Sequence, residues 1–513
     1  MQTIEITDNN QLILLEQPEQ FIDFSQEGGK KHKSRKQKFL GQGSFGCTFM
    51  PGLDCKSKKC KTNRSKHLVN KIQEVTRDSE NELYISNFIK YKIKNYNKRF
   101  APVEKHNIIK FNKIKDSNMF DYITKKCNDS VFNQYSDSNY FYFINKDYYM
   151  FYMRYIKGRP LGDYLTNYFN KLSPDNFYNN YFYSLYYLLN SIYIFNKIKL
   201  VHNDLHNNNI MYDLDLKKPI IIDFGMSYKT KSCYKYVSGI DFHKIKDIFI
   251  CWAPYYERGG GYWYLTEKKF ISFITYNNLL IDTPLEKFHP INVSSNFEKN
   301  FLTKDLIDFF VNDIYNSFKL WPEMKDIFKP NEFNEYYKII SNYYYKFLPE
   351  NDTENKYQYI SDIVAELLPY VFKYYDLHSL SSNFIQNLYK KIQNEILNKS
   401  NKNNSQNYID IYYGFINQLF KKVYYPDPRY RLSSHQFISI FSFVFKYCKN
   451  NHSKILEENN FIHDFHHKFK LLLLDINFDY DLFFNKNYAY IDFNIILNHN
   501  NFNIIKNFNH EIL

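Results

Sequence analysis

The pattern of hydrophobic and polar positions divides the chain into a strand-rich part and a helical part. Between residues 38 and 156, short apolar runs separated by turn residues predict strands. One helix is expected there, at residues 79–90, because apolar side chains recur at partial helical spacing. From residue 161 onward the pattern is mainly helical, and residues 177–197 are aromatic or aliphatic almost all round, as in a buried helix. The pattern therefore predicts an α+β fold.

Three segments stand apart from this pattern. Residues 1–33 are polar and run into a basic stretch, and we interpret them as an N-terminal leader. Residues 398–406 contain only Asn, Lys, Ser and Gln, a composition typical of a surface loop. Residues 446–513 are apolar enough to pack but contain no motif that we can interpret. We treat them as a C-terminal extension of unknown role.

The composition favours a soluble intracellular protein. Hydrophobic residues make up 44% and charged residues 24%, which is ordinary, whereas 50 Tyr, 48 Phe and only 14 Gly indicate a bias toward AT-rich codons. We attribute the net charge of +13 to the same bias, so no specific nucleic acid is expected as a partner. The seven Cys form no disulfide framework, which favours reduced thiols. Because neither a signal peptide nor an apolar run of about 18 residues is found, no membrane association is expected.

A glycine motif provides the first chemical signal. Gly41, Gly43 and Gly46 form Gly-x-Gly-x-x-Gly, a spacing that lets backbone N–H groups approach phosphate oxygens. Pro51 and Gly52 follow and interrupt any helix, so a strand–loop–strand hairpin fits better than the strand–loop–helix of dinucleotide-binding folds. The expected nucleotide-binding positions here are Leu40, Gly41, Gln42, Gly43, Ser44, Phe45, Gly46 and Thr48.

A lysine in the next apolar strand is the second signal. Lys71 follows Leu68 and Val69, which suits an inward-pointing ammonium that contacts phosphates and needs a carboxylate to hold it. The helix that follows offers Glu80 and Glu82. We favour Glu82, because apolar residues three and seven positions later turn that face inward.

The most specific segment contains two acidic residues and an Asn. Asp204 lies five residues before Asn209 in a loop between apolar runs, and Asp223 begins an Asp-Phe-Gly sequence after another apolar run. Carboxylate and amide oxygens suit Mg²⁺, so Asn209 and Asp223 are assigned as metal ligands. Asp204 is assigned as the base for an attacking hydroxyl, with Lys71 and Asn209 as further catalytic residues. The set predicts phosphoryl transfer.

The order of these motifs resembles the eukaryotic-type protein kinase superfamily, and the glycine segment is similar to that of serine/threonine-protein kinases of large DNA viruses. The resemblance implies a bilobal protein-kinase fold over residues 34–445, with a strand-rich N-lobe at 34–156 and a mainly helical C-lobe with insertions at 157–445. It implies ATP and Mg²⁺ as cofactors, with Mn²⁺ as an alternative, and transfer to Ser or Thr of a protein substrate. A viral kinase of this kind would act in the host cytoplasm or travel in the virus particle. The oligomeric state is not indicated.

The resemblance also assigns residues outside the main motifs. Met153 would lie beside the adenine base in the hinge that follows a strand. Glu257 in a stretched Ala-Pro-Glu motif would pair with Arg431 of a late Asp-Pro-x-x-Arg motif. Asp313 is the preferred candidate for the buried Asp of the C-lobe, and Asp410 is too close to Arg431 for that role.

Two residues of the catalytic segment depart from the family pattern. Asn203 replaces the Arg that usually precedes the catalytic Asp and binds an activation-loop phosphate, which argues against switching by that phosphate. His206 replaces the usual Lys and makes the segment similar to aminoglycoside and choline phosphotransferases. A small-molecule kinase therefore stays as an alternative, and a catalytically silent scaffold is a second one.

Overall fold

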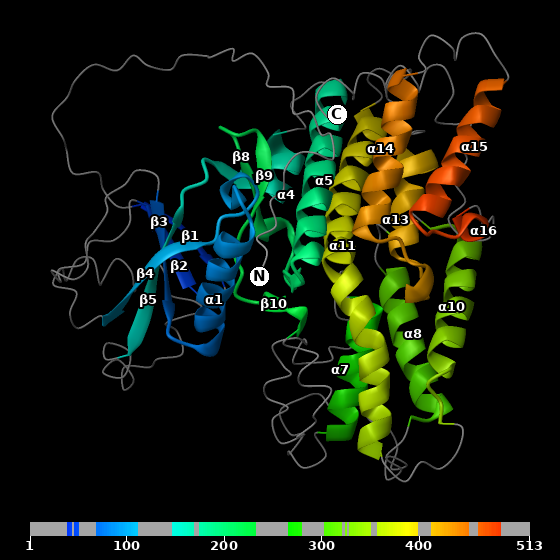
Figure 1. Cartoon of the computed structure of the whole chain (residues 1–513), viewed down its shortest axis with the longest axis horizontal. Helices are drawn as coiled ribbons and strands as arrows, with labels where there is room; N and C mark the ends of the chain where they lie inside the picture. Colours follow the sequence, from blue (N-terminus) through cyan, green and yellow to red (C-terminus); the bar gives the residue numbers. More distant parts are fainter. Residues whose placement is uncertain are drawn as a thin grey trace. The chain divides into compact units, whose positions relative to one another are not determined.

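The computed structural model describes part of the 513-residue chain in detail (Figure 1). The described residues are 38–43, 46–50, 68–110, 146–168, 174–231, 265–279, 302–320, 324–325, 328–349, 356–398, 412–450 and 460–483. The expected leader at 1–33, the expected Ala-Pro-Glu segment and almost all of the expected loop at 398–406 lie outside these residues. Within them the fold is mixed α/β, mostly helical, with small antiparallel sheets. The chain forms two compact units, one of residues 1–159 and 209–227 and the other of 160–208 and 228–513.

The first unit is built on a five-stranded antiparallel sheet in the order β1-β2-β3-β5-β4. Its strands are β1 (Lys38–Gly43), β2 (Gly46–Met50), β3 (Leu68–Glu74), β4 (Val103–Lys110) and β5 (Asp147–Arg154). The strands expected from the sequence are therefore present. β3 is the central strand, which places its side chains at the middle of the sheet.

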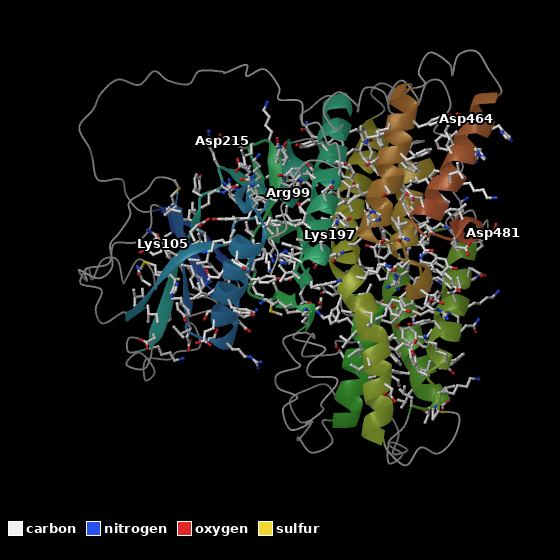
Figure 2. All side chains as sticks on the ribbon, viewed as in Figure 1. Arg99, Lys105, Lys197, Asp215, Asp464 and Asp481 are labelled. Carbon is white, nitrogen blue, oxygen red and sulfur yellow. The ribbon has the colours of Figure 1, made fainter. Side chains whose placement is uncertain are left out.

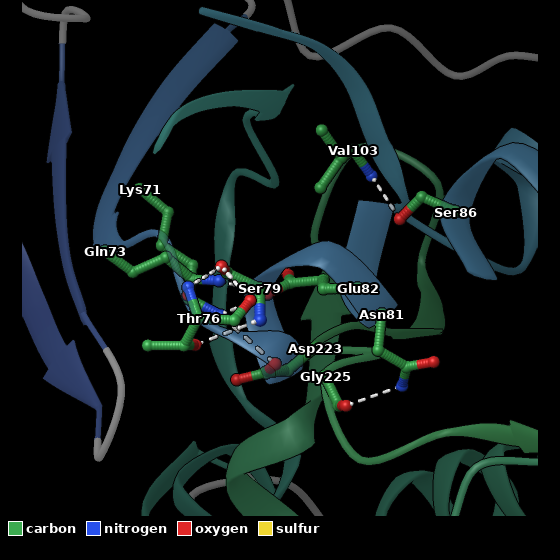
Figure 3. Close-up of polar contacts among 10 residues, drawn as sticks. All are labelled: Lys71, Gln73, Thr76, Ser79, Asn81, Glu82, Ser86, Val103, Asp223 and Gly225. Carbon is green, nitrogen blue, oxygen red and sulfur yellow. Dashed lines mark hydrogen bonds and ion pairs between the residues drawn. The ribbon is translucent and has the colours of Figure 1, made fainter. Parts of the chain in front are cut away.

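Helix α1 (Arg77–Lys92) lies against this sheet and contains the helix expected at 79–90. It begins with a capping box, in which the side chain of Thr76 accepts from Ser79 and the Ser79 side chain accepts from Thr76. Further along the helix, the Ser86 hydroxyl accepts the backbone N–H of Val103 at 3.0 Å. The Ser86 bond ties α1 to β4, as Figure 3 shows.

A short turn and a second sheet complete the first unit. The turn η1 (Tyr96–Lys98) follows α1, and β6 (Gly158–Pro160), β8 (Ile210–Asp213) and β9 (Lys218–Ile221) form a sheet in the order β6-β8-β9. The residues just after β9 carry the Asp-Phe-Gly sequence, so this sheet positions Asp223.

The second unit is mainly helical. Its helices are α4 (Leu161–Asp163), η5 (Tyr164–Tyr168), α5 (Pro174–Lys197), α7 (Thr266–Leu279), α8 (Lys304–Leu320), α10 (Pro330–Tyr345), α11 (Lys356–Asn398), η10 (Tyr412–Ile416), α13 (Asn417–Val423), η11 (Pro428–Tyr430), α14 (Ser434–Asn450), α15 (Asn460–Asp475) and α16 (Tyr480–Phe483). A two-stranded sheet joins β7 (Leu200–Val201) to β10 (Tyr228–Lys229). The turn η7 (Asn207–Asn209) ends the loop after β7.

Helix α5 is the buried helix that the sequence predicts, and it packs against α11 and α14 (Figure 1). The hydroxyl of Tyr181 donates to the carbonyl of Phe384 at 2.8 Å, which satisfies a phenol inside the core. The C-terminal helices belong to the same packing, because Phe443 on α14 contacts the rings of Phe465 and Phe469 on α15. Figure 2 labels Asp464 on α15 and Asp481 on α16, and the Asp464 carboxylate accepts from the Tyr447 hydroxyl of α14 at 2.7 Å.

Two findings concern membrane-spanning helices and the redox state of the cysteines. In the part of the chain that the structure describes, no helix is both long and apolar enough to cross a membrane. Cys47 on β2 is disulfide-bonded, so the expectation that all seven thiols are reduced is wrong at this position.

Candidate active site

A buried ion pair links the central strand of the first unit to helix α1. The Nζ atom of Lys71 lies 2.9 Å from Oε2 of Glu82 and 3.2 Å from Oδ1 of Asp223 (Figure 3). The Lys71 and Glu82 side chains are only 9% and 2% exposed, whereas that of Asp223 is 35% exposed. The structure therefore brings together three residues that the sequence predicts to act together, and it selects Glu82 over the exposed Glu80.

The charges of this cluster are strongly coupled. Burial disfavours the Lys71 ammonium, but the carboxylates of Glu82 and Asp223 outweigh that effect, so the pKa of Lys71 lies above its ordinary value. Burial raises the pKa of Glu82, and the Lys71 ammonium and the Gln73 amide oppose this shift. Lys71 is therefore a permanent cation beside one carboxylate that is partly exposed.

Gln73 is a member of this cluster that the sequence reasoning missed. Its Nε2 donates to Oε2 of Glu82 at 3.2 Å, the same oxygen that accepts from Lys71. Because side chains two apart on a strand share a face, Gln73 points toward α1 with Lys71. A polar residue two positions after the lysine, in a buried strand, is the signal that could have identified it.

Asn81 ties α1 to the loop that carries Asp223, and it was also missed. Its Nδ2 donates to the carbonyls of Gly225 at 2.9 Å and Ser227 at 2.8 Å. Asp223 itself has φ 59°, a left-handed conformation that a non-glycine residue adopts only when its surroundings hold it there. Such strained residues cluster at functional sites, which agrees with the role predicted for Asp223.

Asn209 lies beside the same loop, because its carbonyl accepts the backbone N–H of Ile222 at 3.0 Å. Its side chain is buried, and the neighbouring Asp223 carboxylate is partly exposed. Among the described residues, no group of three or more His, Cys, Asp or Glu side chains could hold a metal ion. One carboxylate and one amide suit Mg²⁺ in a site whose remaining ligands are phosphate and water, so these residues fit the metal that the sequence predicts.

The glycine segment forms the expected hairpin. β1 and β2 pair antiparallel with Gly43 opposite Gly46, and only Ser44 and Phe45, which lie outside the described residues, connect them. A Cβ atom on Gly46 would lie 2.5 Å from the carbonyl oxygen of Ile72, so no side chain fits there. The close approach of β2 to β3 therefore requires glycine at this position.

The other predicted nucleotide contacts lie on the same sheet. Leu40, Gly41 and Gln42 are on β1, and Thr48 on β2 is paired with Lys71 in the strand register. Met153, near the end of β5, is partly buried and packs against the apolar cluster that contains Phe151. Their contact with a nucleotide stays a prediction.

In the second unit, Asp376 on α11 anchors the loop that carries Asp204. Its carboxylate accepts the backbone N–H groups of His202 at 2.8 Å and Asn203 at 3.0 Å. Burial raises the pKa of Asp376, and these bonds and neighbouring positive charges oppose the shift. The preference for Asp313 as the buried C-lobe Asp is therefore wrong, because Asp376 on α11 is the residue that the catalytic segment contacts.

The loop is held further along its length by the same helix. The Ser379 hydroxyl and the Asn383 amide donate to the carbonyl of Leu205 at 2.9 and 3.0 Å. Asp204 precedes this carbonyl by one residue, and its side chain is 42% exposed. The base predicted from the sequence is therefore accessible on a loop whose backbone is fixed on both sides.

His206 lies beside Asp204, and its contacts indicate which ring nitrogen carries the proton. Its Nε2 is 3.6 Å from Oδ2 of Asp204, while its Nδ1 accepts the backbone N–H of Asn208 at 3.1 Å. Because Nδ1 is occupied as an acceptor, the proton of the neutral ring belongs on Nε2, facing Asp204. A neutral His206 ring therefore faces the predicted base, where the usual lysine would place a positive charge.

Arg431 forms a buried, bidentate ion pair with Glu267. Nη1 of Arg431 lies 2.7 Å from Oε2 and Nη2 lies 3.0 Å from Oε1 of Glu267. Glu257, which the sequence analysis assigned to this pair, lies outside the described residues. Among the residues that the structure describes, the partner of Arg431 is Glu267, ten positions later at the start of α7.

The comparisons with known proteins add no family. Neither the protein-family models nor the curated proteins contain a match to this chain. Its function therefore has to be inferred from the residues described above.

Proposed function

We propose that this chain is an ATP-dependent serine/threonine-protein kinase with a bilobal kinase fold. The observation that carries the proposal is the buried Lys71 ammonium between the carboxylates of Glu82 and Asp223. Burying a charged cluster is costly, so it is weak evidence for stability alone. Its value here would be chemical, since it fixes a cation beside a carboxylate that suits a metal ion.

Each group has a role in the proposed reaction. Lys71 binds the α- and β-phosphates of ATP, and the glycine hairpin offers backbone N–H groups to the phosphates. Asp223 and Asn209 would hold Mg²⁺, which when bound neutralises charge on the phosphate oxygens. The acceptor hydroxyl oxygen bonds to the γ-phosphorus as the bond from that phosphorus to the bridging oxygen of ADP breaks. Asp204 takes the hydroxyl proton.

The exposure of Asp204 supports its role as the base. A carboxylate that accepts a proton from a protein hydroxyl has to be reachable by that hydroxyl. The bonds from Asp376, Ser379 and Asn383 hold the surrounding backbone, so the side chain can be accessible without being loosely placed.

A small-molecule kinase is the second candidate, and His206 is the observation that favours it. Serine/threonine kinases usually have a lysine at this position, and here a His carries its proton toward Asp204. Such an enzyme would use the same nucleotide-binding residues and phosphorylate an amino-alcohol or a sugar.

The test is transfer of the labelled γ-phosphate of ATP by purified full-length protein with Mg²⁺ or Mn²⁺. Acceptors are a panel of acidic and basic proteins and, in parallel, aminoglycosides and choline. Label on Ser or Thr with wild type but not with Asp204→Asn supports the protein-kinase proposal. Label only on a small molecule supports the second candidate. ATP binding without any transfer would refute both and identify a catalytically silent protein.

A further inference from the structure

Lys268 is a buried lysine that reaches the residue before the predicted base. It lies in the first turn of α7, and its side chain contacts Asn203 in the loop after β7. Its Nζ donates to Oδ1 of Asn203 at 2.5 Å and lies 4.2 Å from the centre of the Tyr375 ring. The residue is 2% exposed, so this ammonium is inside the fold and does not meet substrate.

The position of Lys268 is fixed by its neighbour in sequence. Glu267 is fully buried and pairs with both terminal nitrogens of Arg431, whose Nε also donates to the carbonyl of Tyr425 at 2.8 Å. A bidentate pair inside the core restrains the first turn of α7. The Lys268 side chain therefore starts from a rigid support.

Asn203 is the residue that needs support. Its φ is 68°, a left-handed conformation that is uncommon for residues other than glycine and that surrounding contacts have to hold. Its backbone N–H is held by Asp376, and its side chain is held by Lys268. Because Asp204 is the next residue, the conformation of Asn203 sets the direction in which the Asp204 side chain leaves the backbone.

The charges around Lys268 agree with this arrangement. Burial lowers the pKa of Lys268 to about 7, and the carboxylates of Asp204 and Asp376 oppose that shift. Asp204 lies in the catalytic loop, and Asp376 on α11 holds that loop. A hydrogen bond from a buried amine to an amide oxygen is strong in such surroundings because water does not compete for either partner.

We propose that Lys268 is a positioning residue for the catalytic loop, which holds Asn203 in its left-handed conformation and thereby orients Asp204. This inference rests on the proposed function, because it assigns Lys268 a part in the same phosphoryl transfer.

A double-mutant cycle on the rate of phosphoryl transfer tests this. Lys268→Met keeps the length of the side chain and removes the donor. Asn203→Gly removes the acceptor, yet glycine adopts φ 68° without strain. We expect each variant to lower kcat about 10- to 100-fold, with KM for ATP within about twofold of wild type, because a small displacement of a catalytic group costs rates of that order. The double variant should be no slower than the slower single variant.

Two further variants separate positioning from general damage. Lys268→Arg keeps a donor and should recover most of kcat. Lys373→Met is the matched control, because Lys373 also lies over a tyrosine ring, that of Tyr374, and its loss should leave kcat unchanged. If Lys268→Met fails to fold, the kcat values of Asn203→Gly and Lys268→Arg still test the proposal. Only Asn203→Gly removes the hydrogen bond, so only this variant should be slow.

The outcomes of wild type and variants are distinct. Wild-type protein that transfers phosphoryl to no acceptor refutes the proposed function, and the positioning role falls with it. Active wild type with Lys268→Met at full kcat overturns this inference alone. Single effects that multiply in the double variant also overturn it, because the two residues would then act independently.

Discussion

Replacing Glu82 with Gln tests whether the buried ion pair places Lys71 for catalysis. The substitution keeps the shape of the side chain and removes the charge that lies 2.9 Å from Lys71. The ammonium retains Asp223 at 3.2 Å, but that carboxylate is 35% exposed and lies on a different element. Since one of two partners remains, we expect a loss of stability of about 1–3 kcal/mol. Leaving a buried charge with no partner typically costs about 3–5 kcal/mol.

The effect on the activation free energy should be of the same order as the effect on stability. With Glu82 neutral, the attraction on Lys71 comes from Asp223 alone, and a displacement of the ammonium by about 1 Å can cost about 100-fold in rate. Lys71 has a pKa above its ordinary value, so its stabilising charge is fully present below about pH 10.4, the pKa of an unfolded lysine, and is lost only as pH rises through the still higher folded value. The loss of kcat/KM in Glu82→Gln should therefore be constant between about pH 6 and 9.

The assay is the initial rate of γ-phosphate transfer over a range of ATP concentrations, with thermal unfolding measured on the same samples. Glu80→Gln is the control, because Glu80 lies in the first turn of the same helix but is exposed. It should change stability by less than about 1 kcal/mol, the size of a charge–helix-dipole interaction, and leave the rate unchanged. If Glu82→Gln retains kcat/KM within twofold of wild type, or Glu80→Gln is equally slow, the ion pair does not place Lys71.

Three further predictions concern the base, the core and the pH dependence of stability. Asp204→Asn should lower kcat by about 100-fold or more while ATP binding by calorimetry is retained, and loss of binding would make Asp204 a structural residue. Arg431→Met leaves the Glu267 carboxylate buried without its partner and should cost about 3–5 kcal/mol in denaturant unfolding, part of which Glu267→Gln in the same chain should restore. Burial lowers the pKa of Lys422 to about 7, against about 10.4 in an unfolded chain, so between these values the folded protein binds fewer protons and its stability rises with pH. The free energy of unfolding of wild type should therefore increase relative to that of Lys422→Met as pH rises from about 7 to 9, and parallel curves would contradict the burial of this amine.

The local features of this protein follow from its amino-acid pattern alone. Gly41, Gly43 and Gly46 predict a hairpin, since glycines at that spacing allow a tight turn, and β1 and β2 form it. The choice of Glu82 followed from the spacing of apolar residues on one helix, and the structure pairs it with Lys71. Such inferences succeed because the residues concerned are close in sequence, or because helix and strand periodicity sets the face on which they lie.

The long-range partners, in contrast, depend on which distant elements pack together. Asp376 accepts hydrogen bonds from the backbone N–H groups of His202 and Asn203, which lie more than 170 positions away in the sequence. Nothing in the local sequence of Asp376 distinguishes it from Asp313. Glu267 reaches Arg431 from a helix 164 positions away. Local pattern specifies which face of an element is buried, but not which other element covers it. That choice depends on how the helices of the second unit pack together, and it decides which of several similar acidic and basic residues meet.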